Sequence, residues 1–262
     1  HGLSIFLKKN KNLKNCFFKL DGNEELIKEK MKKYSISSSS VQIYNTFSAV
    51  SDEETPLTAI KNSKNSSMWN TINSQIIDDS DISLSAGNTG VLFVISRMLL
   101  KTIDGVSKPA LAGLWPNKKG VSVVLDLGAN IECDENNLVD FSEMGSALSK
   151  SLFNSQKAKV ALLNIGSEEI KGTEIIKKAY TKLKKISEYG DFEFVGYVEP
   201  NKIFEGDANV IVADGFTGNI ALKTAEGTSK FLTDSLKESL QENILSKFSL
   251  LFSYFSLKKF KS

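Results

Sequence analysis

The sequence almost lacks histidine: the one histidine among its 262 residues is His1, at the terminus. A Ser-His-Asp or Cys-His nucleophile needs an imidazole inside the fold, so both kinds of nucleophilic site are excluded. Zinc sites usually need histidine or clustered cysteines, and we therefore expect no metal. Whatever reaction the chain performs, we expect it to proceed without histidine.

Cysteine is also scarce. Cys16 and Cys133 cannot build a disulfide framework, which favours a reducing cytoplasm. With no internal histidine to activate it, Cys133 is expected to pack or to support a site rather than to attack a substrate. Because the chain begins with His1 and not with Met, we expect it to be processed or to be a fragment.

The sequence also lacks a large net charge and long apolar runs. The formal net charge is +2 at pH 7 and the charges are interspersed, so we expect no nucleic-acid partner. No N-terminal signal peptide is visible, and no apolar run reaches the roughly 18 residues of a membrane-spanning helix. The length of 262 residues allows one large α/β domain or two small ones.

Apolar runs of strand length alternate with helical patterns along most of the chain. Expected strands are 16–20, 41–44, 82–85, 110–115, 121–126, 160–164, 192–196 and 209–213. Expected helices are 24–34, one or two within 56–77, 89–101, 138–152, 173–187 and 217–240. This alternation predicts an α/β fold with three layers, a mostly parallel sheet between helices on both faces. Ligands of such sheets bind at the carboxyl ends of the strands.

Four Gly-rich polar turns follow predicted strands. They are 85–90 (SAGNTG), 126–130 (DLGAN), 164–172 (NIGSEEIKG) and 214–219 (DGFTGN). A turn that leads into a helix presents unpaired backbone N–H groups and the positive end of the helix dipole, which favours an anion. One such turn is weak evidence, whereas four at the same sheet edge predict a site for a phosphate or a developing oxyanion.

Lys171 is the clearest cation in these turns. It lies just before Gly172 and a predicted helix start, where the helix dipole disfavours a positive charge unless an anion is bound. Glu168 is expected either to orient Lys171 or to cap the helix. We expect Asp126 to accept bonds from loop N–H groups, whereas Asp214 is open to a loop role or an acid–base role.

Two common nucleotide-binding motifs are absent. No G-x-G-x-x-G follows an early strand and no G-x-x-x-x-G-K-[ST] occurs, so no cofactor is expected.

The segment Lys61–Met68 is rich in lysine and serine and could join two helices or bind phosphate or an acidic partner. The tail 244–262 combines apolar and basic residues; it could touch a membrane surface or pack against the domain or a second subunit.

Taken in order, these motifs resemble a known family. The matching stretches are 64–68 (KNSSM), 85–90, 108–112 (KPALA), 125–130, 163–172 and 214–219. They are similar to the bacterial acyl-[acyl-carrier-protein]–phosphate acyltransferases of phospholipid synthesis, from about Asp52 to Gly227.

The resemblance implies an activity and its partners. Such enzymes convert a long-chain acyl-[acyl-carrier protein] and inorganic phosphate to acyl phosphate and free carrier protein. A downstream acyltransferase then moves the acyl group to glycerol 3-phosphate. The family's fold is similar to that of the isocitrate and isopropylmalate dehydrogenases and of phosphotransacetylase. Its members are homodimers in the cytoplasm that associate with the membrane surface.

The resemblance and the turn chemistry together define the predicted site. Phosphate dianion is already a competent nucleophile, so the protein must chiefly hold it beside the thioester and stabilise the oxyanion. The residues predicted to act in catalysis are Asn88, Lys171, Asn219 and Asp214. Those predicted to bind phosphate or the oxyanion are Ser85, Gly87, Thr89, Gly90, Asn164 and Gly218. Those predicted to support them from behind are Asp126, Asn130 and Glu168.

The chain also departs from the family pattern. The family begins with a strand and an Asp-x-Met-Gly-Gly-Asp loop and ends with a Lys-Ser-His-Gly stretch, both of which lie beyond this sequence. Pro200 stands where the family usually places glycine. We therefore expect a single α/β domain over 1–262, incomplete at both termini, with 244–262 as an apolar and basic helical tail.

Three alternatives remain beside the acyl-phosphate-forming enzyme. A short-chain phosphotransacetylase would use coenzyme A on the same fold. A non-catalytic remnant would bind phosphate or carrier protein without turnover. A decarboxylating dehydrogenase is disfavoured because Arg97 is the only arginine and no cluster of aspartates for a metal is evident.

Overall fold

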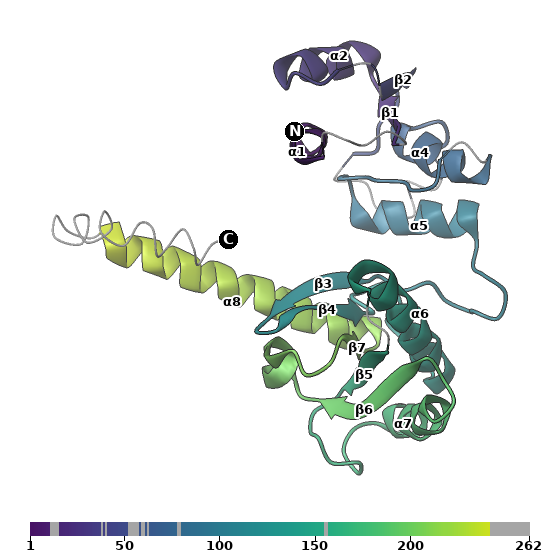
Figure 1. Cartoon of the computed structure of the whole chain (residues 1–262), viewed down its shortest axis with the longest axis vertical. Helices are drawn as coiled ribbons and strands as arrows, with labels where there is room; N and C mark the ends of the chain where they lie inside the picture. The colour runs from purple at the N-terminus through teal and green to yellow at the C-terminus, as the bar shows by residue number, and fades with distance from the viewer. Residues whose placement is uncertain are drawn as a thin grey trace. The chain divides into compact units, whose positions relative to one another are not determined.

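The computed structural model describes residues 1–10, 16–37, 39, 41–51, 58, 61, 63–77, 80–154 and 157–241. They form two compact units, His1–Pro109 and Ala110–Ser262 (Figure 1). A single domain over 1–262 stays a prediction, because compactness alone does not decide whether the units act together. The tail predicted at 244–262 lies outside the described residues.

The first unit contains a small parallel sheet and four described helices. Strand β1 (Phe18–Gly22) pairs in parallel with β2 (Val41–Asn45). The helices are α1 (Gly2–Lys9), α2 (Glu24–Lys33), α4 (Ser67–Ile76) and α5 (Thr89–Leu100). Apolar side chains of α4 and α5 form the core of this unit: Met68, Ile72, Val91 and Ile95.

The strand predicted at 82–85 is wrong. Residues 80–87 instead run back along α4 and pair with no strand among the described residues. The Gln75 side-chain amide donates to the Asp81 carbonyl at 2.9 Å, and the Ser83 hydroxyl donates to the Thr71 carbonyl at 2.8 Å. A Cβ added at Gly87 would lie 3.0 Å from Met68 Cε. The segment therefore returns the chain to the first turn of α4, and α5 begins beside it.

The second unit is built on a five-stranded sheet. Its strands are β3 (Gly113–Asn117), β4 (Gly120–Leu125), β5 (Ala158–Leu163), β6 (Phe192–Val198) and β7 (Val210–Val212). They lie in the order β3-β4-β7-β5-β6, with β3 antiparallel to β4 and every other pair parallel. The predicted mostly parallel sheet is confirmed.

Helices cover both faces of this sheet. On one face, α6 (Glu135–Phe153) and α7 (Glu174–Ser187) pack over a core that includes the fully buried Phe141, Leu162 and Leu183. Burial of such a side chain contributes about 1.5–3 kcal/mol. The 3₁₀ helix η2 (Pro200–Glu205) and the long helix α8 (Gly215–Gln241) contribute to the core on the other face. The three predicted layers are therefore present in this unit.

The starts of three helices are fixed by side-chain caps. Asp134 forms a reciprocal capping box at the start of α6, and the Thr173 hydroxyl accepts a bond from the Ile176 N–H at 3.3 Å at the start of α7. Asp214 accepts a bond from the Thr217 N–H at 2.8 Å at the start of α8. Since each of these helices follows a parallel strand, all three starts lie at the carboxyl edge of the sheet.

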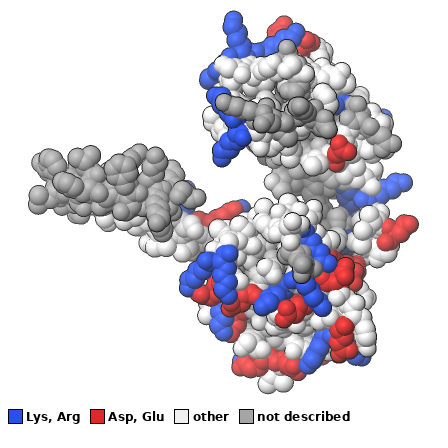
Figure 2. Space-filling model, in the orientation of Figure 1, with Lys and Arg blue, Asp and Glu red and all other residues white. Residues whose placement is uncertain are grey.

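Surface charges of the second unit are mixed in sign. Figure 2 shows lysine and carboxylate side chains interspersed on its visible face. Many are paired, as in Lys118–Glu205 at 2.7 Å and Lys202–Glu199 at 2.9 Å. Such exposed pairs contribute little stability, and this face carries no basic stripe of the kind that nucleic-acid-binding proteins use.

Candidate active site

A polar residue follows each parallel strand of the second unit. These residues are Asp126 after β4, Asn164 after β5, Glu199 after β6 and, one position later, Asp214 after β7. Because the strands are parallel, all four lie at one edge of the sheet. Glu199 is not among the predicted residues, although a carboxylate directly after a strand is the signal that also marks Asp126. Its carboxylate accepts a bond from Lys202 at 2.9 Å, which raises the pKa of Lys202.

Asp126 organises the loop after β4. Its side chain is fully buried, and Oδ1 accepts bonds from the backbone N–H groups of Leu111, Gly128 and Ala129 at 3.0, 3.2 and 3.0 Å. Oδ2 accepts bonds from the Asn130 backbone N–H at 2.7 Å and from its side-chain amide at 2.8 Å. This is the loop role expected of Asp126, and it places Asn130 beside it. The supporting role predicted for Asn130 stays a prediction.

The start of α8 packs closely on that loop. A Cβ at Gly215 would lie 2.6 Å from the Asn130 carbonyl oxygen, and a Cβ at Gly218 would collide with the Asp126 carbonyl oxygen. Only glycine fits at either position unless the backbone moves. The close approach also sets the exposed Asn219 beside Gly128, where a Cβ would lie 3.3 Å from Asn219 Cγ.

Asp214 caps α8 with both carboxylate oxygens. Oδ1 accepts the Thr217 N–H at 2.8 Å and Oδ2 accepts the Thr217 hydroxyl at 2.9 Å. The sequence left a loop role and an acid–base role open for Asp214, and these bonds favour the loop role. A catalytic role for Asp214 stays a prediction.

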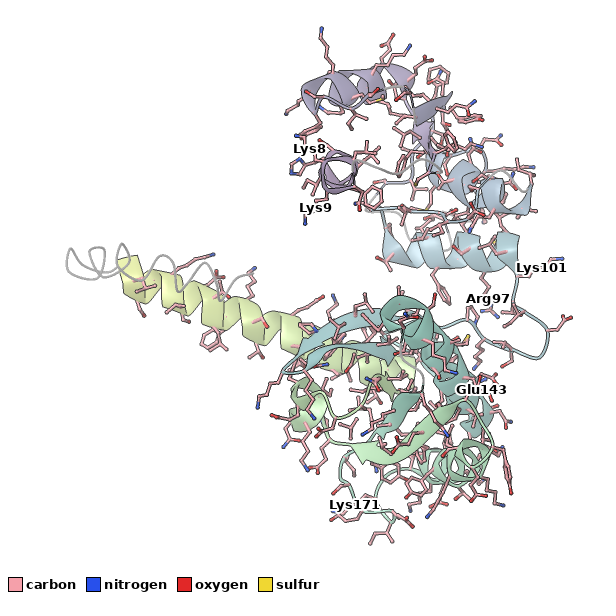
Figure 3. All side chains as sticks on the ribbon, viewed as in Figure 1. Lys8, Lys9, Arg97, Lys101, Glu143 and Lys171 are labelled. Carbon is pink, nitrogen blue, oxygen red and sulfur yellow. The ribbon has the colours of Figure 1, made fainter. Side chains whose placement is uncertain are left out.

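The loop from Gly166 to Gly172 carries Lys171, and Figure 3 labels this residue on the connection after β5. The Lys171 side chain is about half exposed, with Nζ 3.9 Å from Glu168 Oε1. A Cβ at Gly166 would lie 2.6 Å from Glu168 Oε2 and 3.2 Å from Lys171 Cγ, so both side chains cross over this glycine. Glu168 is thus near enough to orient Lys171, one of the two roles predicted for it.

A second contact holds this loop from the side of α7. The Tyr180 hydroxyl donates to Glu169 Oε1 at 2.7 Å, and Lys184 Nζ lies 3.5 Å from the same oxygen. The bond from Tyr180 and the charge of Lys184 lower the pKa of Glu169. The same bond, together with burial, raises the pKa of Tyr180 to about 12.

These shifts predict a pH dependence of stability. Because the pKa of Glu169 is depressed in the fold, its contribution is complete above the ordinary value of 4.5 and is lost as the pH falls through the folded pKa. Because the pKa of Tyr180 is raised, its contribution is complete below 10.0 and is lost as the pH rises towards about 12. Denaturation midpoints measured against pH should therefore fall less steeply at both extremes in Tyr180→Phe. Identical profiles for Tyr180→Phe and the original chain would contradict this coupling.

The predicted turn at 85–90 belongs to the first unit. Asn88 caps α5 by accepting the Val91 N–H at 3.1 Å, and the Ser85 hydroxyl accepts the Gly87 N–H at 3.2 Å. Thr89 and Gly90 form the exposed first turn of α5. Met68 touches Gly87, so the start of α4 in the Lys64–Met68 stretch adjoins this turn. The first turns of two helices thus lie together, an arrangement that favours an anion.

The predicted site residues thus divide between the two units. The carboxyl edge of the second unit's sheet holds Asp126, Asn130, Asn164, Glu168, Lys171, Asp214, Gly218 and Asn219. The first unit holds Ser85, Gly87, Asn88, Thr89 and Gly90. Both groups offer donors and helix starts suited to an anion, and their catalytic roles stay predictions.

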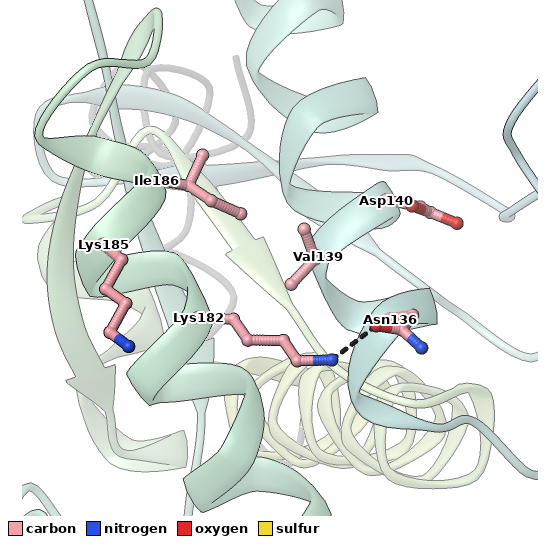
Figure 4. Close-up of a pocket in the computed structure, with 6 residues that line it drawn as sticks. All are labelled: Asn136, Val139, Asp140, Lys182, Lys185 and Ile186. Carbon is pink, nitrogen blue, oxygen red and sulfur yellow. Dashed lines mark hydrogen bonds between the residues drawn. The ribbon is translucent and has the colours of Figure 1, made fainter.

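A separate pocket of about 290 Å³ lies between α6 and α7. Figure 4 shows Lys182 reaching across it to the Asn136 side-chain oxygen, at 2.5 Å. Lys182 Nζ also lies 3.3 Å from Glu135 Oε1. A backbone hydrogen bond to the Glu135 carboxylate and, after it, the bond from Lys182 lower the pKa of Glu135. No predicted site residue lines this pocket; its polar contacts join the two helices.

Two solved structures with a similar fold are phosphotransacylases. The EutD phosphotransacetylase from Staphylococcus aureus matches with a TM-score of 0.59 at 16% identity, covering 87% of each chain. A branched-chain phosphotransacylase from Enterococcus faecalis V583 matches with a TM-score of 0.51 at 13% identity, covering 79% of this chain and 83% of that one. The fold is therefore of the phosphotransacetylase class, as predicted.

Sequence relatives narrow this class to one family. A phosphate acyltransferase of Pelagibacter ubique (strain HTCC1062) is 54% identical over 247 residues, which are 94% of this chain and 73% of that protein. A phosphate acyltransferase of Bradyrhizobium diazoefficiens is 42% identical over 90% of this chain and 67% of that protein. A family model described as "Fatty acid synthesis protein" matches residues 4–262. The chain belongs to the phosphate acyltransferase family, which confirms the predicted acyltransferase function in phospholipid synthesis.

Proposed function

We propose that the chain transfers the acyl group of a long-chain acyl-[acyl-carrier protein] to inorganic phosphate. An oxygen of hydrogen phosphate forms a bond to the thioester carbonyl carbon, and the carbon–sulfur bond of the collapsing tetrahedral intermediate breaks. The leaving thiolate takes the proton that the phosphate loses. The products are acyl phosphate and the free thiol of the carrier protein, so neither a histidine base nor a covalent acyl-enzyme is needed.

The loops at the carboxyl edge of the second unit's sheet support this proposal. Lys171 is a half-exposed cation held on a fixed loop, and Asn219 is an exposed amide that the close packing of α8 sets beside Gly128. We assign Lys171 to the negative charge of the phosphate and Asn219 to the oxyanion that develops on the thioester carbonyl. Preorganised donors of this kind are the largest single contribution to catalysis in many acyl transfers.

The first turn of α5 is the anion-binding element of the first unit in this proposal. The Thr89 and Gly90 N–H groups lie in the first turn of the helix, where they have no partner within the helix. We propose that they bind phosphate or the oxyanion, with Asn88 fixing the turn through its cap on Val91. Ser85 and Gly87 shape the approach to this turn.

A single assay tests the proposed reaction. The chain is incubated with palmitoyl-[acyl-carrier protein] and labelled phosphate, with unacylated carrier protein as the control, and the expected product is labelled acyl phosphate. Palmitoyl-coenzyme A is expected to be a poorer donor. Absence of product would contradict the proposal for this chain, as would a trapped covalent acyl-enzyme. Preference for a short-chain coenzyme A thioester would favour a phosphotransacetylase instead.

We further propose that the chain forms a homodimer through the second half of α8. Phe231, Leu232 and Leu236 are 69%, 61% and 45% exposed on this half, which extends beyond the sheet in Figure 1. Leu232 and Leu236 are four residues apart and therefore lie on one face of the helix. A second copy would bury them. Sedimentation at several concentrations measures the assembly, and a monomer at all concentrations would contradict it.

We also propose a cytoplasmic location with peripheral contact to the membrane and transfer of the product to a glycerol-3-phosphate acyltransferase. No helix within the part of the chain that the structure describes is long and apolar enough to cross a membrane. An acyl phosphate with a long chain partitions into lipid, which favours release at a membrane surface. Flotation with phospholipid vesicles measures this contact; complete absence of the chain from the vesicle fraction would contradict it.

A further inference from the structure

Asn164 is a nearly buried residue at the carboxyl end of β5. It follows β5, and its backbone N–H donates to the Val198 carbonyl of the neighbouring strand at 3.0 Å. The residue is only 4% exposed. Its backbone is therefore fixed in the sheet, and its side chain lies beneath the loop that carries Lys171.

The Asn164 amide joins the two ends of that loop. Its Nδ2 donates to the Gly166 carbonyl at 3.2 Å and to the Lys171 carbonyl at 3.1 Å. The Lys171 N–H in turn donates to the Glu168 carbonyl at 3.0 Å. Both backbone polar groups of Lys171 are thus engaged, one of them by a side chain anchored in the sheet.

Gly172 makes room for this arrangement. Its φ of +94° lies in the region that favours glycine, and a Cβ there would collide with Asn164 Oδ1. Oδ1 is buried and has no hydrogen-bond partner among the described residues. An unpaired buried carbonyl oxygen costs free energy, so the contribution of this side chain to the loop comes from the two bonds that Nδ2 donates.

We infer that Asn164 is a positioning residue that acts through Lys171, holding its backbone so that the ammonium group meets the reacting phosphate. This inference rests on the proposed function. It replaces direct phosphate binding by Asn164 with an indirect role, because the donors of its amide are used within the loop and the side chain is buried. The Gly166–Gly172 loop is then a rigid support for Lys171 rather than a set of separate ligands.

The test compares Asn164→Ala and Asn164→Asp with Lys171→Ala in the phosphate-dependent assay. Loss of the two donors should lower kcat/KM for phosphate by about 10- to 100-fold, the effect of a displacement of about 1 Å in a catalytic group. Asn164→Asp keeps the size of the side chain but removes its N–H donors, so it should be at least as impaired as Asn164→Ala. In the double variant with Lys171→Ala, the two losses should not multiply, because Asn164 acts through Lys171.

Asn117 provides a matched control on the β3–β4 hairpin. Its amide donates to the Ser122 hydroxyl at 2.8 Å, its oxygen accepts the Lys119 N–H at 2.8 Å, and a Cβ at Gly206 would collide with that oxygen. Asn117→Ala should therefore lower the unfolding midpoint while leaving kcat/KM unchanged. Multiplying losses for Asn164 and Lys171, or normal activity in Asn164→Asp, would overturn the inference. Absence of turnover in the unsubstituted chain would instead overturn the proposed function.

Discussion

Lys171→Ala is expected to lower the rate of acyl phosphate formation by about 100- to 1000-fold, the usual cost of removing one donor that stabilises charge in a transition state. Lys171 Nζ lies 3.9 Å from Glu168 and its side chain is about half exposed, so the pair contributes little to stability. The loss should therefore appear in the rate and not in the folding of the chain. The measurement is the initial rate with palmitoyl-[acyl-carrier protein] and labelled phosphate.

Lys177→Ala is the matched control for this prediction. Lys177 lies on α7, six positions along the chain, and pairs with Glu174 at 3.1 Å on the helix surface. It carries the same charge but lies outside the Gly166–Gly172 loop. We expect normal activity in Lys177→Ala. Equal rates for the two variants would show that Lys171 has no specific role.

Most of the second unit could be predicted because its elements carry strong local signals. The apolar run 160–164 predicted β5 to within two residues, and the helix 173–187 matches α7 with Thr173 as its cap. Burial on both faces makes parallel strands nearly continuous apolar runs. The polar residue after each run then marks the carboxyl edge, which is why Asp126, Asn164 and Asp214 could be chosen from sequence.

The segment 82–85 shows where such signals fail. Ile82 and Leu84 alternate with polar residues as a half-buried strand would, yet they are 74% and 81% exposed. The segment is held instead by polar contacts, such as the bond that the Ser83 hydroxyl donates to the Thr71 carbonyl. A period of two indicates a strand only when a neighbouring strand is available to pair with it, and pairing partners are not encoded locally.

Close contacts between segments that are distant along the chain could not be predicted from the sequence either. Gly215 and Gly218 are required because α8 packs on the loop after β4, almost ninety residues earlier in the chain. The bond from Tyr180 to Glu169 depends on how α7 turns over the loop before it. The sequence marks the glycines of the 214–219 turn as candidates for ligand binding. The structure shows that they also allow close packing, which no local pattern reveals.

The largest loss of stability is expected for Asp126→Ala. The substitution leaves four backbone N–H groups and the Asn130 amide without their acceptor in a buried loop. Each buried unsatisfied group costs about 1–3 kcal/mol, and since water and relaxation recover part of this, we expect a total of at least about 3 kcal/mol. Denaturant unfolding of the variant and of the original chain measures the difference.

Asp134→Ala is the matched control for Asp126→Ala. It also removes an aspartate that accepts backbone N–H groups, but at a helix start and not in the buried loop. Asp134 accepts two backbone N–H groups at the start of α6, at 2.9 and 2.8 Å, and helix caps of this kind contribute about 1 kcal/mol. Asp126→Asn should fall between the two, because it keeps an acceptor for Leu111, Gly128 and Ala129 but turns an N–H donor towards those of Asn130. Equal losses in Asp126→Ala and Asp134→Ala would mean that the loop keeps its shape without Asp126. The support of Asn219 through Gly128 would then rest on the packing of α8 alone.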